Sequence, residues 1–113
     1  MSGLSTHVLD LALGRPAAGV PVRLEAQRDG GWTAVADAVT DDDGRVARLL
    51  PAGASLAAGD YRLTFDTAAY FAWRGGESFY PAVTVTFTVR DAAQHHHVPL
   101  LLSPFAYATY RGS

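Results

Sequence analysis

The sequence predicts an all-β protein: a two-sheet sandwich of eight strands with one short helix. Apolar residues alternate with polar ones along most of the chain, which is typical of strands that bury one face. Clusters of Gly, Pro and Asp interrupt these runs at short intervals and mark turns. Residues 1–113 show no linker or repeat, so we expect one domain over this whole range.

The first half of the chain contains four predicted strands. They cover residues 4–13, 20–26, 32–39 and 45–50. The first ends at the turn Gly14-Arg15-Pro16, and Gly30-Gly31 separates the second from the third. The acidic run 41–43 followed by Gly44 predicts another turn, because glycine adopts a positive φ without strain.

The second half adds a loop, a helix and the remaining strands. Residues 51–59 are expected to form a loop, and the strands are expected at 61–65, 83–89, 95–102 and 106–111. Asp66-Thr67 predicts a cap for a helix over residues 68–74, which Gly75-Gly76 would end. Ser103-Pro104 is interpreted as the turn between the last two strands.

The composition excludes several classes of protein. With 49% hydrophobic and 18% charged residues the chain is not disordered, and a net charge of −2 without a basic block argues against nucleic-acid binding. There is no cysteine for disulfides or thiolate metal sites. The N-terminus has no signal-peptide pattern and no run reaches eighteen apolar residues, so we expect no membrane segment and a cytoplasmic location.

Four histidines give the chain its chemical character. Strand alternation predicts that His95 and His97 project from one face and His96 from the other. His7 and Tyr110 likewise stand on faces that are otherwise apolar. If the faces that carry His7, His97 and Tyr110 meet, they form an apolar groove with few polar groups, as in a small-molecule pocket.

Each of these residues also has a less specific interpretation. His7 alone is compatible with a structural or surface role, and the triplet 95–97 with a solvated strand start. Histidines two apart on a strand can ligate zinc, with His7 or a carboxylate as a third ligand. Arg45 is compatible with an exposed turn cation, although its planar fork suits a carboxylate or a ring imide.

The ends and the acidic run have similar alternatives. Arg111 and Ser113 are compatible with a solvated tail, although a chemical cluster at a chain end needs something to hold it in place. The run 41–43 lacks the spacing of a calcium loop and is interpreted as a turn.

Two separated motifs and several landmarks together resemble the 5-hydroxyisourate hydrolase family, the transthyretin-like proteins of purine catabolism. The motifs and landmarks are 4–10, 14–22, 40–45, 59–61, 66–71, 79–81 and 95–113. The last segment ends in Tyr-Arg-Gly-Ser, which separates the hydrolases of this family from hormone-carrier transthyretins. Ala106, Ala108 and His96 depart from the common pattern, at positions to which we assign no catalytic role.

The resemblance implies a transthyretin-like sandwich that assembles as a homotetramer, with active sites where two dimers face each other. It implies catalytic roles for His7 and His97 and substrate binding by Arg45. It further assigns to the substrate pocket the terminal residues Tyr110, Arg111, Gly112 and Ser113.

The implied activity is hydrolysis of 5-hydroxyisourate to 2-oxo-4-hydroxy-4-carboxy-5-ureidoimidazoline, with no metal or organic cofactor. The main alternative is a transthyretin-type binding protein for a flat aromatic small molecule. A metallohydrolase that uses His7, His95 and His97 is a third hypothesis, and a purely structural β-domain a fourth.

Overall fold

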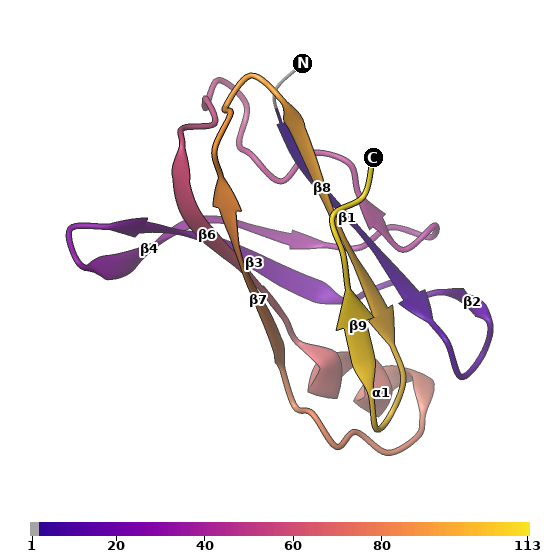
Figure 1. Ribbon diagram of the computed structural model, residues 1–113. Helices are drawn as coiled ribbons and strands as arrows, with labels where there is room; N and C mark the ends of the chain where they lie inside the picture. Colours follow the sequence, from indigo (N-terminus) through magenta and orange to yellow (C-terminus); the bar gives the residue numbers. More distant parts are fainter. Residues whose placement is uncertain (1–2) are drawn as a thin grey trace.

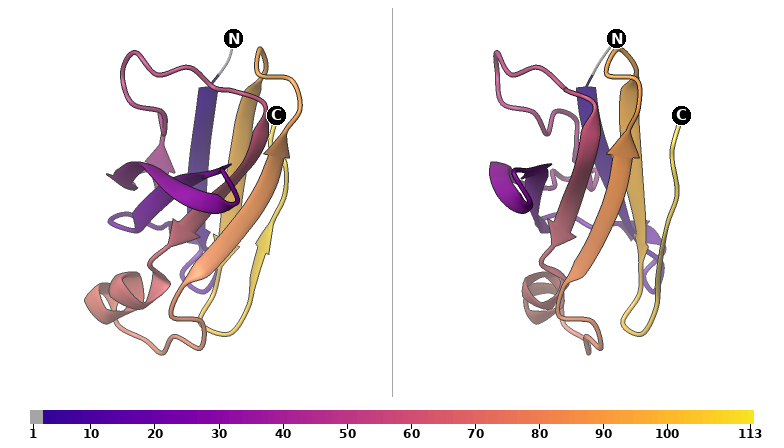
Figure 2. Two further views of the ribbon diagram at one scale, coloured as in Figure 1. Left: turned by 90° about the vertical axis from the view of Figure 1, so that its left-hand side faces the viewer. Right: turned by 60° about the vertical axis from the view of Figure 1, so that its left-hand side comes forward.

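The computed structural model describes residues 3–113. Residues 1 and 2, which belong to the predicted domain 1–113 and to the N-terminus expected to lack a signal peptide, lie outside the described residues. Two β-sheets pack face to face, and one short helix lies at their lower end in Figures 1 and 2. The predicted sandwich with a single short helix is confirmed. No helix within residues 3–113 is long and apolar enough to span a membrane.

The first sheet joins the two ends of the chain. Its strands are β1 (Gly3–Asp10), β2 (Arg15–Pro16), β5 (Arg45–Val46), β8 (His95–Leu102) and β9 (Tyr107–Thr109). β1 and β8 run parallel along their full length, from Gly3 opposite His95 to Asp10 opposite Leu102. Figure 1 shows β1 and β8 side by side, so the N-terminal and C-terminal motifs become neighbours. Antiparallel ladders add β2 and β5 to β1, and β9 to β8.

The second sheet is antiparallel throughout, in the order β4-β3-β6-β7. Its strands are β3 (Pro21–Arg28), β4 (Gly31–Val39), β6 (Gly59–Phe65) and β7 (Val83–Val89). β3 and β4 form a hairpin whose two turn residues, Asp29 and Gly30, both have positive φ. Turns of this kind match the twist of paired strands, which explains the sharp reversal at this point.

The core lies between the two sheets and consists of the alternate residues that face inward. Its largest fully buried side chains include Leu4, Val8, Leu24, Leu63, Phe65, Leu100 and Leu102. Because these residues take every second position in their strands, the other positions of the first sheet face outward.

The helix α1 (Thr67–Arg74) begins and ends where the capping signals predict. The Asp66 carboxylate accepts a hydrogen bond from the Ala69 N–H at 3.0 Å, and the Gly75 N–H donates to the Phe71 carbonyl at 2.8 Å. Two side chains of the helix, Tyr70 and Arg74, bond the carboxylate of Asp10 on β1. The helix is therefore fastened to the first sheet by a buried charge.

The first strand ends earlier than predicted, at Asp10 instead of residue 13. The Asp10 carboxylate accepts a hydrogen bond from the Leu13 N–H at 3.0 Å, and its carbonyl accepts one from the Gly14 N–H at 2.8 Å. These bonds form a tight turn in place of further strand. Arg15 and Pro16, predicted as turn, then pair with β1 as the extra strand β2.

Two other predicted strands are shorter than expected. The strand predicted at 45–50 is only Arg45–Val46, because beyond it the chain contacts β1 mainly through the bond from the Leu49 N–H to the Leu4 carbonyl. The strand predicted at 106–111 is Tyr107–Thr109, and an isolated bridge between Gly112 and His97 follows it.

Candidate active site

The outer face of the first sheet collects the polar residues that the sequence singles out. In β1 the side chains of Thr6 and Val8 are buried, and His7 between them is half-buried on the opposite face. His7 is paired with Arg45 of β5. Directly opposed residues of neighbouring strands share a face, so the imidazole and the guanidinium project from the same side.

A tight turn positions Arg45. The Asp41 carboxylate accepts hydrogen bonds from the N–H groups of Asp43 and Arg45, each at 2.9 Å. Gly44 has a φ of +74°, and a Cβ there would lie 2.4 Å from the Val8 carbonyl oxygen. Only glycine fits so close to β1 in this conformation, and its carbonyl accepts the Val8 N–H at 2.7 Å. The acidic run is thus a turn that holds the arginine beside His7.

The histidine triplet divides between the two faces as predicted. His96 is buried in the interior, where its Nδ1 lies 3.0 Å from the Gln94 carbonyl oxygen. His95 and His97 lie on the outer face, and Ser5 of β1 bonds to both of them. The Ser5 Oγ is 2.7 Å from Nε2 of His95 and 2.8 Å from Nδ1 of His97.

The C-terminal segment is attached to this cluster through Gly112. Its N–H donates to the His97 carbonyl at 2.8 Å. A Cβ at position 112 would lie 2.4 Å from the Cδ2 atom of His97, so the backbone passes directly against the imidazole. These contacts hold the C-terminal segment against β8.

The other terminal residues lie around the same segment. Tyr110 is 56% exposed, and Arg111 donates from Nη2 to Gln94 Oε1 at 3.1 Å. Both contribute to the lining of a cleft of about 320 Å³ at the sandwich edge, where β7 approaches His96. Ser113 is exposed. The structure therefore groups Gly112 with His7, Arg45 and His97, while Tyr110 and Arg111 border the neighbouring edge cleft.

The surroundings of His97 lower its pKa below the ordinary value of 6.5. Burial has the largest effect because it disfavours the charged imidazolium. The charge of Arg45 and the charged forms of His7 and His95 act in the same direction, and a hydrogen bond with the backbone of Ser5 opposes them. His97 is consequently neutral near pH 7 and able to accept a proton.

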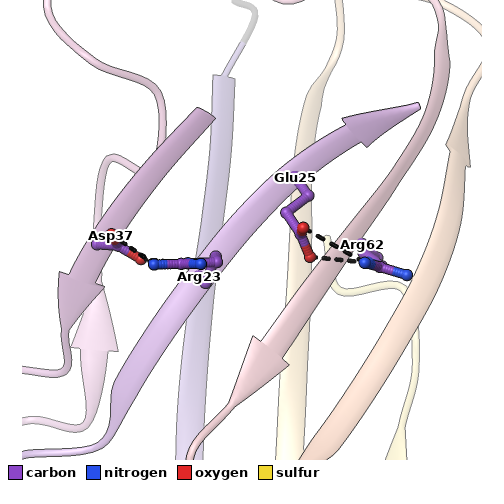
Figure 3. A network of polar contacts seen from close by, with 4 residues as sticks. All are labelled: Arg23, Glu25, Asp37 and Arg62. Atoms are coloured by element: carbon purple, nitrogen blue, oxygen red, sulfur yellow. Dashed lines mark hydrogen bonds and ion pairs between the residues drawn. The ribbon is translucent and has the colours of Figure 1, made fainter. Parts of the chain in front are cut away.

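The two sheets present different outer surfaces. The second sheet carries two ion pairs, Asp37 with Arg23 and Glu25 with Arg62 (Figure 3). In each pair the arginine donates two hydrogen bonds to the carboxylate. The first sheet carries the imidazoles of His7, His95 and His97 and the guanidinium of Arg45. Within residues 3–113, none of these groups forms an ion pair with a carboxylate.

The donor arrangement gives the zinc hypothesis no support. Across residues 3–113, no three His, Asp or Glu side chains are grouped as the ligands of one metal ion would be. His95 and His97 instead share a hydroxyl partner.

Ser5 is the member of the cluster that the sequence analysis missed. The signal was present, because Ser5 lies two positions before His7 and thus shares its face. What the sequence does not reveal is the parallel register, which sets Ser5 opposite His97.

Comparison with known proteins shows the family of this chain. A family model described as the HIUase/Transthyretin family matches residues 4–112. The chain belongs to this family. It is 51% identical over 118 residues to a 5-hydroxyisourate hydrolase from Caulobacter vibrioides, with all of both chains covered. It is 49% identical over 115 residues to one from Mus musculus, with 99% of this chain and 96% of the mouse protein covered.

Solved structures of the HIUase/Transthyretin family have the same fold. A 5-hydroxyisourate hydrolase from Klebsiella pneumoniae has a TM-score of 0.85 and 42% identity, and all of both chains are covered. Sea bream transthyretin in complex with thyroxine has a TM-score of 0.89 and 36% identity, with 97% of this chain and 94% of that chain covered. The predicted transthyretin-like architecture is confirmed.

Proposed function

We propose that this chain hydrolyses 5-hydroxyisourate to 2-oxo-4-hydroxy-4-carboxy-5-ureidoimidazoline. The observation that carries the proposal is the grouping of His7, Arg45 and His97 on one sheet face. The choice of substrate rests on the similarity to 5-hydroxyisourate hydrolases of Caulobacter vibrioides and mouse.

The proposed reaction adds water across an acyl carbon–nitrogen bond of the six-membered ring. The water oxygen bonds to the acyl carbon, the carbon–nitrogen bond breaks, and the nitrogen gains a proton. His97 is the better candidate for the base that takes the proton from water, because its lowered pKa keeps it neutral. His7, half-buried on the neighbouring strand, would position the water or return a proton to the nitrogen.

Arg45 would bind the ring oxygens and the negative charge that develops on them. Its planar guanidinium can donate two parallel hydrogen bonds, and the Asp41 turn fixes its backbone beside His7. Preorganised donors of this kind stabilise a transition state without moving during the reaction.

The terminal residues would complete the pocket. Gly112 lies against His97, so the segment Tyr110–Ser113 passes along the border of the site. Tyr110 would limit the access of bulk water, and the Ser113 hydroxyl or terminal carboxylate would orient a histidine or the substrate.

The site is open to solvent in the single chain, and we propose that a second copy covers it in a homotetramer. Arg45 is exposed and His7 and His97 are only half-buried in the single chain. Large apolar side chains such as Leu11, 56% exposed, and Leu13, 45% exposed, lie just beyond β1. A second copy facing this sheet would cover them and exclude water from the reacting ring.

A binding protein for a flat aromatic ligand is the alternative function, since the fold is shared with sea bream transthyretin in complex with thyroxine. The imidazole pair and the arginine favour chemistry over simple binding, because an aromatic ligand needs apolar contact more than a proton acceptor. A catalytic assay separates the two functions.

The test uses the purified, untagged chain and 5-hydroxyisourate freshly made by oxidising urate. Loss of its ultraviolet absorbance should be much faster with the chain than without it. Arg45→Ala should lower kcat/KM at least tenfold, whereas Arg90→Ala, which removes an exposed arginine just beyond the end of β7, should leave it unchanged. Decay at the spontaneous rate with the wild-type chain would refute the proposed function.

A further inference from the structure

Ser5 occupies an unusual place between two imidazoles. The residue is 9% exposed, and its hydroxyl oxygen lies 2.7 Å from His95 Nε2 and 2.8 Å from His97 Nδ1. Both distances are those of good hydrogen bonds. The parallel register produces this geometry, because Gly3 lies opposite His95 and Ser5 opposite His97.

Hydrogen counting limits how the three groups share protons. A serine hydroxyl has one proton to donate, and a neutral imidazole donates from one nitrogen and accepts at the other. Ser5 therefore donates to one histidine and accepts from the other. In one arrangement the Nδ1–H of His97 donates to Ser5, which donates to Nε2 of His95. In the other arrangement every bond is reversed.

Only the first arrangement suits a base at His97. Because Nδ1 is engaged by Ser5, Nε2 is the ring nitrogen left for the substrate side. When Nδ1 carries the proton, Nε2 has a free lone pair; when Ser5 donates to Nδ1, Nε2 is protonated and cannot accept. The direction of the Ser5 hydroxyl thus decides whether His97 is a base or an acid.

We propose that His95, Ser5 and His97 form a proton relay, in which Ser5 sets the tautomer of His97 and the exposed His95 exchanges the proton with solvent. The inference rests on the proposed hydrolysis for its catalytic part. Once His97 Nε2 has taken a proton, its Nδ1 proton moves to the Ser5 oxygen while the Ser5 proton moves to His95 Nε2. His97 is then neutral with its proton on Nε2, and His95 carries the positive charge.

The relay gives His95 and Ser5 positioning roles and leaves the chemistry to His97. The basic groups that face His97 are His7 on β1, Arg45 on β5 and His95 on β8. Of these, only His95 is joined to it through the Ser5 hydroxyl. Loss of His95 should therefore change which ring nitrogen of His97 carries the proton, whereas loss of a remote charge should not.

The first test is nitrogen NMR of the histidine side chains in the wild-type chain and in the variants Ser5→Ala, Ser5→Thr and His95→Ala. At a pH where His97 is neutral, the wild type should hold its proton on Nδ1. Ser5→Ala and His95→Ala should shift the population toward Nε2, and Ser5→Thr, which keeps the hydroxyl, should restore Nδ1. Ser78→Ala removes a hydroxyl from a distant loop and serves as the control. An unchanged His97 tautomer in both variants would overturn the relay.

The second test measures kcat, KM and the pH profile of the same variants. Ser5→Ala and His95→Ala should lower kcat about tenfold or more with little change in KM, since proton transfer contributes factors of this size. The acid limb of the pH–rate profile should shift in both variants, and Ser5→Thr should recover most of the wild-type activity. Unaltered kcat and pH profiles would contradict the relay. The NMR experiment needs no substrate. If the wild-type chain had no hydrolase activity, the proposed function would be rejected, but the NMR experiment would still decide whether Ser5 sets the tautomer of His97.

Discussion

The imidazole of His97 is half-buried and lies near three other basic groups, and both features affect its protonation. Burial and the nearby positive charges hold its pKa below 6.5. The folded state therefore binds fewer protons at this site than the unfolded state does between the two pKa values. Stability from this site is present above pH 6.5 and declines as the pH falls toward the folded pKa.

The pKa of His97 should respond to the charge of Arg45. In Arg45→Gln one positive charge is lost, so the pKa of His97 should rise toward 6.5, while Arg90→Gln should leave it unchanged. Proton NMR titration of the His97 ring measures this in the absence of substrate. A His97 pKa that is identical in wild type and Arg45→Gln would show that the arginine is too far away to matter.

Gly112 lies so close to the His97 ring that no larger residue fits there without a shift. In Gly112→Ala the new methyl would lie 2.4 Å from the imidazole Cδ2, so the ring or the terminal segment must move. A displacement of about 1 Å in a catalytic group can cost as much as a hundredfold in rate, and we expect at least a tenfold loss of kcat.

The matched control for this substitution is Gly31→Ala, because a Cβ at position 31 meets no atom within 4 Å. Steady-state kinetics on both variants check the prediction. Full activity of Gly112→Ala would mean that the terminal segment does not border the reacting group.

At the scale of elements, the attachment of α1 to β1 holds the end of the strand that carries His7. Burial alone would raise the pKa of Asp10, but hydrogen bonds from Tyr70, the Leu13 N–H and Arg74, with the charge of Arg74, outweigh it and hold the pKa below 3.8. Burial, together with the hydrogen bond to Asp10 and the charge of Asp10, raises the pKa of Tyr70 to about 12, although Arg74 acts in the opposite direction. The ionised carboxylate therefore stabilises the fold above about pH 4 and loses this contribution as the pH falls through the folded pKa.

Removing this carboxylate should destabilise the whole domain. In Asp10→Ala, Arg74 and Tyr70 lose their shared buried partner, and we expect the free energy of unfolding to fall by about 3 kcal/mol. Asp37→Ala breaks the exposed pair with Arg23 shown in Figure 3 and should change stability little. Urea denaturation of the two variants measures the contrast, and equal losses would argue against a structural role for Asp10.

Most elements could be predicted from local patterns. β7 and β8 occupy the predicted ranges, because their alternation and the flanking turn residues are clear. β2 was not predicted, and β5 was predicted too long, since each has two residues and exists only through pairing with β1. Tertiary contact, not the local sequence, decides where these short strands begin and end.

The candidate site was predictable to a similar extent. Alternation separated His96 from its two neighbours, and the family resemblance selected His7, Arg45 and His97. The bridging role of Ser5 depends on the parallel register between β1 and β8, which joins segments some ninety residues apart. No local pattern encodes that register, so the hydroxyl could be found only in the folded chain.

For the whole molecule, the fold brings both chain ends to one face, and the proposed homotetramer would close that face. An extension beyond Ser113 should place new residues beside Gly112 and His97. A C-terminal tag should therefore lower kcat/KM, whereas the same tag at the N-terminus should have a smaller effect. Assays on both tagged forms, with light scattering to count subunits, give the comparison. A fully active C-terminally tagged tetramer would show that the free end is dispensable.

The central claim is that the imidazoles of His7 and His97 carry the hydrolysis. The most direct measurement is turnover of freshly generated 5-hydroxyisourate by His7→Ala and His97→Ala, each checked for an unchanged oligomeric state. General acid–base catalysis contributes roughly a hundredfold or more, so each variant should lose at least about a hundredfold in kcat. Near-normal turnover by both variants, in assemblies identical to the wild type, would contradict the account.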